Sequence, residues 1–186
     1  MLRTVIPVVL LVLPLAACTG DAQPTEGASG GASESGSSEG VSPEVREGLV
    51  ALYAGDHPRA QDTADGECFA DALLERIAPG ELEEVGVVVD GAVVTDLPLL
   101  EPETAGDWIG ATFACVDYFE ESARAQVAVT KGTVDWREYA ACLREEIDLE
   151  VVRAALVAAL GGDWDSDAVA ALSRAQAECS TAANPG

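Results

Sequence analysis

The side chains that could do chemistry in this chain are mostly carboxylates, since Asp and Glu number 33 and histidine occurs once. Paired carboxylates can act as acid and base in glycoside hydrolysis, and Glu120 with Glu121 and Glu145 with Glu146 are adjacent pairs. In so acidic a chain, most such pairs are expected on solvated helix faces. His57 lies in a Gly-Asp-His-Pro segment typical of a surface turn and has no nucleophile motif near it. We therefore predict no catalytic residue and keep a carboxylate-dependent hydrolase as an alternative.

A second group of carboxylates surrounds an aromatic residue near the C-terminus. Asp163, Asp165 and Asp167 alternate around Trp164, which matches the first three ligand positions of a calcium loop. The loop then lacks the glycine at its sixth position and has Arg174 where a glutamate is needed, so we predict no metal site. An aromatic side chain bordered by charge is typical of a binding contact. These four residues are therefore our candidate binding residues.

The elements that must position these residues are predominantly helical. Apolar residues recur at helical spacing through most of residues 43–186, and Ser42 before Pro43 is typical of a helix start. Thr104 with Asp107 predicts a capping box, ahead of an apolar face that continues to residue 119. The period changes near residues 86–95, where Asp-Gly between valine runs fits either a small hairpin or an extended connector. The fold class is therefore all-α, with at most one hairpin.

Cysteines predict covalent links between these helices. The four cysteines of the helical region are Cys68, Cys115, Cys142 and Cys179. An even number in an exported domain indicates two disulfides, and no CxxC spacing indicates a redox or metal site. Loop entropy alone does not decide between 68–115 with 142–179 and 68–179 with 115–142.

A degenerate repeat favours one pairing. Cys68 and Cys142 each open a helical stretch with an aliphatic residue five positions later, and a later helix in each stretch carries Cys115 or Cys179. If the chain contains two such repeats, each would close its own disulfide. We therefore predict Cys68–Cys115 and Cys142–Cys179.

The N-terminus predicts export. Arg3 precedes a 13-residue apolar run that ends at residue 17, which is shorter than the roughly 20 residues needed to span a bilayer, so residues 1–17 are predicted to be a signal peptide. The run ends in Leu-Ala-Ala-Cys, which resembles the lipobox of bacterial lipoproteins. That resemblance implies that Cys18 receives a diacylglyceryl group and becomes the first residue. The alternative is an ordinary secretory signal, but Leu15 stands where that peptidase requires a small residue.

Residues 18–42 predict a tether between this anchor and the helical domain. They are rich in Gly and Ser and contain no aromatic residue, so they cannot bury enough surface to fold. Without the leader, 33 acidic residues face 9 basic ones, a net charge of −24. Such a charge excludes most nucleic-acid binding and any adhesion to anionic lipid by charge. The predicted membrane contact is therefore the lipid on Cys18 alone.

The helical region as a whole resembles uncharacterised actinobacterial proteins that are secreted or lipid-anchored. The resemblance rests on short stretches around Cys68, residues 86–88, Cys115, Cys142 and residues 156–160, and on the late Cys179. It implies an envelope location and a helical fold with paired cysteines, and it implies no activity.

These features predict a non-catalytic binding module on the extracytoplasmic face of the cell membrane. Its partner would be an envelope protein or a wall component, and no cofactor is expected. A carrier of lipids or small molecules, with an apolar pocket between helices, is the other alternative beside the hydrolase.

Overall fold

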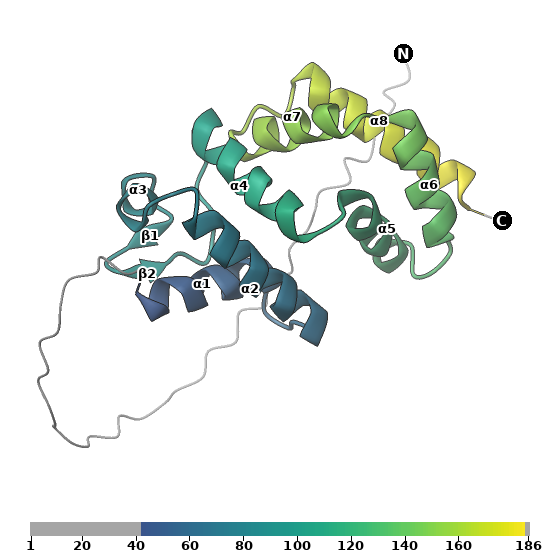
Figure 1. Ribbon diagram of the computed structural model, residues 1–186. Coiled ribbons are helices and arrows are strands. Elements are labelled where there is room, and N and C mark those ends of the chain that lie inside the picture. Colours follow the sequence, from purple (N-terminus) through teal and green to yellow (C-terminus); the bar gives the residue numbers. More distant parts are fainter. Residues whose placement is uncertain (1–41, 185–186) are drawn as a thin grey trace, which may run out of the picture. The chain divides into compact units, whose positions relative to one another are not determined.

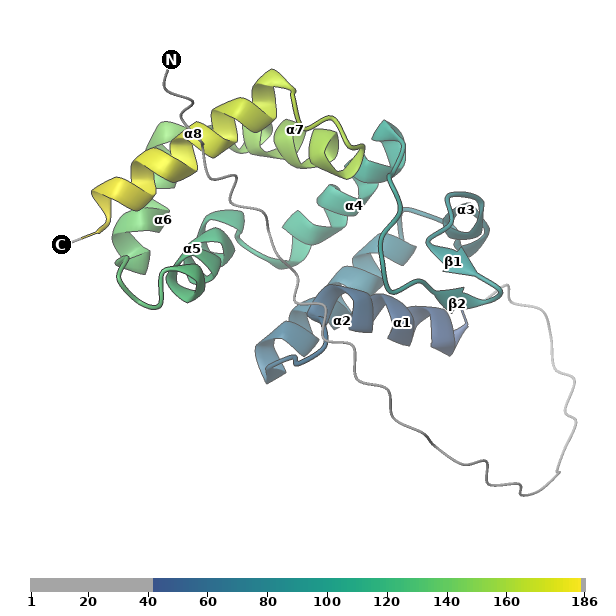
Figure 2. The same ribbon diagram turned by 180° about the vertical axis from the view of Figure 1, so that it is seen from behind.

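The computed structural model describes residues 42–184 and confirms the all-α prediction. These residues form eight helices and one two-stranded hairpin (Figures 1 and 2). The elements are α1 (Pro43–Ala54), α2 (Ala60–Leu74), α3 (Pro79–Glu84), β1 (Val88–Val89), β2 (Ala92–Val93), α4 (Pro102–Cys115), α5 (Tyr118–Val129), α6 (Trp136–Glu146), α7 (Leu149–Leu160) and α8 (Asp167–Ala182).

The hairpin forms where the sequence allowed it. Val88 pairs with Val93 and Val89 with Ala92, in an antiparallel register. The turn residues Asp90 and Gly91 both have positive φ, 52° and 79°, as the tight turns that suit the strand twist require. Two strands alone are marginally stable. This hairpin is supported because it packs against α1 and α3.

Helix α1 contacts the hairpin through a glycine. A methyl group on Gly48 would lie 2.7 Å from Cβ of Val93, closer than two such carbons can approach. We therefore expect Gly48→Ala to lower the free energy of unfolding by about 1–3 kcal/mol, although alanine is the better helix former. Urea unfolding followed by circular dichroism measures the change.

The matched control is Gly106→Ala in α4. A methyl group there would meet no atom within 4 Å. That variant should gain about 0.5–1 kcal/mol of stability from helix propensity alone. If both variants were stabilised, the close contact between α1 and β2 would be refuted.

Polar side chains fix several helix starts. Ser42 accepts a hydrogen bond from Val45 N at 3.2 Å, as predicted for the start of α1. The predicted capping box at Thr104 and Asp107 is wrong, because α4 already begins at Pro102, with Glu101 as its N-cap residue and no side-chain cap bond. Proline is favoured at the first helical position, since its missing N–H is not needed there.

The apolar face expected to continue to residue 119 is interrupted. Helix α4 ends at Cys115, Val116 is extended, and Asp117 starts α5 by accepting a hydrogen bond from Glu120 N at 3.0 Å. In the sequence, an N-cap aspartate at Asp117 followed by Glu120 and Glu121 in the first turn is typical of a helix start. The chain therefore turns at Val116 and Asp117 and begins a second set of helices.

Both predicted disulfides are present, one in each set of four helices. Cys68–Cys115 joins α2 to α4, and Cys142–Cys179 joins α6 to α8. In the first half α1 packs on α2 and α2 on α4, while in the second α5 packs on α6 and α6 on α8. The halves therefore share the packing of three helices around a disulfide. They differ in the remaining helix, because α7 packs on α8 whereas α3 packs on the hairpin that is inserted in the first half.

Burial follows the same repeat. The residue after the first cysteine is fully buried in both halves, as Phe69 and as Leu143. Seven residues before the second cysteine, Trp108 and Leu172 are each 8% exposed. Equivalent positions therefore fill equivalent places in two separate cores, although the side chains differ.

The two cores meet where α4 packs against α7. Phe113 and Leu156 contact both cores, and the N–H of Leu100 donates to the carbonyl of Leu160 at 3.0 Å. The segment before α4 is thereby held beside the end of α7. This junction brings residues of both halves to one surface.

Candidate functional site

Trp164 lies in the turn between α7 and α8 with its side chain in solvent. It is 67% exposed, and Asp163 and Asp165 on either side are also exposed. The turn is held in shape from within, because Asp163 N–H donates to the carbonyl of Ala158 at 2.8 Å and Ser166 caps α8 by accepting from Val169 N. The indole is therefore presented on a fixed turn.

A second exposed apolar residue lies against the same turn. Leu99 is 74% exposed, and a methyl group on Gly162 would lie 3.2 Å from its Cδ2. Gly162 has a φ of +80°, a conformation that favours glycine and that this turn requires. Because glycine has no side chain, it also leaves room for Leu99. We call Leu99 and residues 162–165 the Leu99–Trp164 surface. Trp164 was predictable from the sequence, whereas Leu99 was not, because its approach to the turn depends on the contact between the two halves.

The carboxylates beside this surface are available to a partner. Within residues 42–184, Asp163, Asp165 and Asp167 form no ion pair. Asp167 lies in the first turn of α8, where a negative charge favours the helix dipole. The surface thus combines two exposed apolar side chains with unpaired negative charge.

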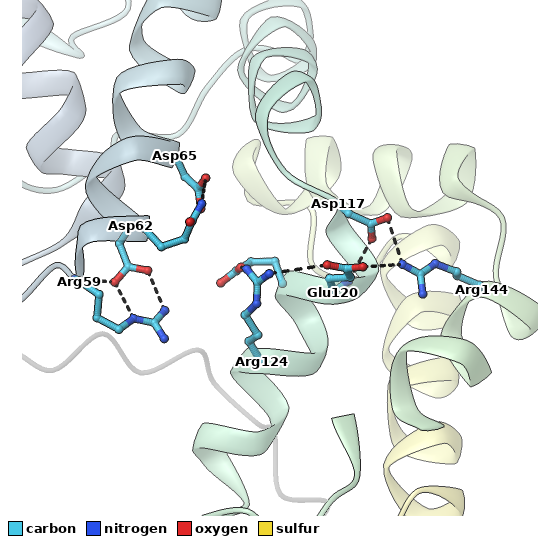
Figure 3. A network of polar contacts seen from close by, with 9 residues as sticks. Arg59, Asp62, Asp65, Asp117, Glu120, Arg124 and Arg144 are labelled. Carbon is cyan, nitrogen blue, oxygen red and sulfur yellow. Dashed lines mark hydrogen bonds and ion pairs between the residues drawn. The ribbon is translucent and has the colours of Figure 1, made fainter. Parts of the chain in front are cut away.

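Other carboxylates are already paired with arginines, in a network where α2, α5 and α6 approach one another (Figure 3). Arg144 of α6 contacts Asp117 at 3.1 Å and Glu120 at 3.7 Å. Arg124 contacts Glu121 at 2.7 Å and Glu120 at 3.6 Å. Exposed pairs of this kind contribute about 0–1 kcal/mol each, so the network orients α5 more than it stabilises the fold.

Arg59 and Asp62 form the pair with the most hydrogen bonds in this region. The Arg59 guanidinium donates to both carboxylate oxygens of Asp62, at 2.7 and 2.9 Å, and the Arg59 backbone N–H donates at 2.8 Å. These bonds lower the pKa of Asp62 to about 2. The ionised form is favoured in the folded chain, so this pair stabilises the fold above the ordinary carboxyl pKa, and the contribution is lost as pH falls through about 2.

We expect a carboxyl NMR titration to show a midpoint near pH 2 for Asp62. In Arg59→Gln the pKa of Asp62 should return toward about 3.9, the ordinary value for aspartate. Arg46→Gln, which removes the partner of Asp71 instead, is the control and should leave Asp62 unchanged. A midpoint near 4 in the unmodified chain would contradict the pairing.

The residues considered for hydrolysis do not converge. Glu120 and Glu121 are held by Arg124, and His57 lies exposed in the loop between α1 and α2. Glu145 and Glu146 lie at the end of α6. Among residues 42–184, no group of three Asp, Glu, His or Cys side chains is arranged to hold a metal ion.

An open groove of about 290 Å³ lies in the second half, at the junction of α6, α7 and α8. Four of its lining residues are apolar and four are charged. The lining residues are Glu146, Ile147, Asp148, Val151, Ala171, Arg174, Ala175 and Glu178.

Two further findings concern the predicted anchor and the relatives of the chain. Cys18 lies outside the described residues, and no helix within residues 42–184 is both long enough and apolar enough to cross a membrane. Comparison with known proteins gives no significant match to any protein family, curated protein or solved structure.

Proposed function

We propose that the helical domain is a non-catalytic binding module, held on the extracytoplasmic face of the cell membrane by lipid on Cys18. The observation that supports it is the Leu99–Trp164 surface, where Leu99 and Trp164 are 74% and 67% exposed beside unpaired aspartates. Two exposed apolar side chains on one turn give a partner apolar area to bury, and the charged residues beside them resemble the border of a binding contact. The partner would be an envelope protein or a wall component.

The anchor rests on the sequence. A leader of 17 residues that ends in Leu-Ala-Ala directly before Cys18 resembles a lipoprotein signal, and the composition of the tether after Cys18 is typical of a flexible spacer. Two or more acyl chains hold a protein stably, so the domain needs no basic or apolar face toward the bilayer. The acidic composition of the chain agrees with attachment through lipid.

The two alternatives have weaker support. A hydrolase would need carboxylates placed around one reacting bond, yet Glu120 and Glu121 are paired with arginine. A lipid carrier would need an enclosed apolar cavity, whereas the groove of about 290 Å³ is open and half of its lining residues are charged. Surface recognition is the function that the arrangement supports best.

The test compares two exposed tryptophans. We expect Trp164→Ala to abolish recovery of a partner from the protein's own membranes. Trp136, at the start of α6, is 40% exposed, and we expect Trp136→Ala to leave recovery intact. The recovered component would be identified by mass spectrometry, purified and bound again in isolation. Full binding of the partner by Trp164→Ala would exclude the Leu99–Trp164 surface as the binding site. Hydrolase activity that is present in the unmodified chain and lost in His57→Ala would refute the non-catalytic interpretation.

The anchor has its own test. Cys18→Ser removes the thiol that would receive the diacylglyceryl group, so incorporation of a fatty-acid probe should fall to background. The protein should then leave the membrane fraction or keep its leader. Cys68→Ser serves as the control and should still be labelled. Unchanged labelling of Cys18→Ser would refute lipid attachment at this residue.

A further inference from the structure

The two disulfides differ in how far solvent reaches them. Cys68 is exposed on α2, and Cys115 is half-buried at the end of α4. Cys179, by contrast, is fully buried, and Cys142 packs against the second core. Among the described residues, neither Cys68 nor Cys115 belongs to the first core. One disulfide therefore lies at the surface, and its counterpart lies in the interior.

The exposure of Cys68 belongs to its side chain. Cys68 lies within α2, whose backbone groups are hydrogen-bonded along the helix, so the exposed atoms are chiefly Cβ and Sγ. Its neighbours four positions away on the same helix face, Ala64 and Ala72, carry only methyl groups. The spacing of the cysteines in the sequence gives no sign of this access, because exposure is a property of the packed helices.

Cys115 also borders solvent, through a small open hollow at the end of α4. The hollow has a volume of about 110 Å³ and lies beside the arginine network of Figure 3. Its lining residues are Gln61, Asp65, Cys115, Val116, Asp117, Glu120 and Arg124. A hollow of this size admits water, so a thiolate released at Cys115 can take up a proton there.

These positions decide how easily each disulfide can be cleaved. A thiolate attacks one sulfur and the other sulfur leaves as a thiolate, so the rate depends on access to the first and on the stability of the second. At Cys68–Cys115 the attacked sulfur is exposed and the leaving sulfur borders solvent. Attack on Cys142 would instead release a thiolate at Cys179 inside an apolar core, where a charge is poorly solvated. Thiols should therefore cleave the first pair selectively.

We propose that Cys68–Cys115 is a site of reversible modification by a low-molecular-weight thiol. The thiolate attacks Sγ of Cys68, a new S–S bond joins the two, and the bond to Cys115 breaks. The electron pair of that bond leaves with Sγ of Cys115, which takes a proton from water. The attacking thiol is thereby oxidised to a mixed disulfide while Cys115 is reduced. Because α2 and α4 stay packed through Phe69 and Trp108, Cys115 remains close enough to reverse the exchange.

Limited reduction of the folded chain tests the selectivity. The full chain in detergent micelles is incubated with mercaptoethanol at neutral pH and quenched with acid at intervals. Free thiols are then alkylated and mapped by mass spectrometry. We expect Cys68–Cys115 to open at least about tenfold faster than Cys142–Cys179, because only the first pair is accessible. Equal rates, or faster opening of Cys142–Cys179, would overturn the proposal.

Urea separates attack on the folded chain from attack after unfolding. Urea below the unfolding transition should leave the opening rate of Cys68–Cys115 nearly unchanged, because thiols reach this pair in the folded chain. The opening rate of Cys142–Cys179 should rise with urea, because attack there requires partial unfolding. A rate for Cys68–Cys115 that rises as steeply as that for Cys142–Cys179 would overturn the proposal.

A substitution on α2 tests the path to Cys68. Ala64→Leu places a larger side chain beside Cys68 on the same helix face and should slow opening of Cys68–Cys115 by about three- to tenfold. Ala170→Leu, the same change at an exposed position of α8, is the control and should leave the rate unchanged. Exchange at Cys68 does not require the Leu99–Trp164 surface, so Trp164→Ala should also open at the unmodified rate. An unchanged rate in Ala64→Leu would overturn Cys68 as the attacked residue.

Discussion

Replacing both Cys142 and Cys179 with alanine should lower the free energy of unfolding by about 4 kcal/mol, measured by urea unfolding at neutral pH. The disulfide closes a loop with a sequence separation of 37 residues. In the loop-entropy account, opening such a loop gives the unfolded chain about 4 kcal/mol of additional freedom. Cys179 is also fully buried, so alanine would leave a small cavity in the second core. A marginally stable domain would lose much of its stability.

The other disulfide is the control for burial. Cys68–Cys115 closes a loop of similar size, with a sequence separation of 47, but Cys68 is exposed on α2. Alanine at these two positions should lower the free energy of unfolding by the loop-entropy contribution, again about 4 kcal/mol, with little added for a cavity. The loss should therefore be larger for the pair that contains Cys179. A change below about 1 kcal/mol for either pair would show that the unfolded chain is compact without the link.

The disulfide pairing was predictable because the repeat is local in the sequence. Each cysteine pair lies inside one set of helices. Cys68 and Cys142 lie within α2 and α6, so the prediction that each opens its helix was wrong, but the aliphatic residue five positions later still marks equivalent helices. The helical class and the hairpin were predictable for a similar reason, since periodicity and turn residues act over a few positions. Signals within single elements, together with the repeated spacing of the cysteines, thus predicted most of the fold.

Contacts between elements could not be predicted in this way. Leu99 joins the candidate surface because Leu100 bonds Leu160 across the two halves, and no local pattern records that contact. Trp164 was predictable as an exposed residue, since it stands among aspartates in a turn. Its apolar neighbour was not.

Phe69→Ala is expected to have a comparable effect on stability. Phe69 is fully buried, and its ring lies 4.7 Å from the ring of Tyr53 and 4.9 Å from that of Trp108, measured between centroids. Removing a buried phenylalanine side chain typically costs about 3–5 kcal/mol, and the aromatic contacts on both sides are lost with it. Urea unfolding followed by circular dichroism measures the loss.

Two variants separate the contributions of volume and ring contacts. Phe69→Leu keeps most of the volume and should recover a large part of the stability lost in Phe69→Ala. Leu143→Ala makes the equivalent deletion in the second half, where no aromatic pair is lost, and should cost about 2–5 kcal/mol. Equal stabilities for Phe69→Leu and Phe69→Ala would show that the ring contacts, and not the filled volume, hold this part of the core.

Hydrogen exchange would show how far the damage from Phe69→Ala spreads. The two cores share few residues, chiefly Phe113 and Leu156, so amides of α1, α2 and α4 should lose more protection than those of α6 and α8. The Leu99–Trp164 surface should nevertheless suffer, because Leu99 belongs to the first half and Gly162 to the second. A partner that uses both residues would therefore bind Phe69→Ala more weakly. Uniform loss of protection would instead show that the halves unfold as one unit.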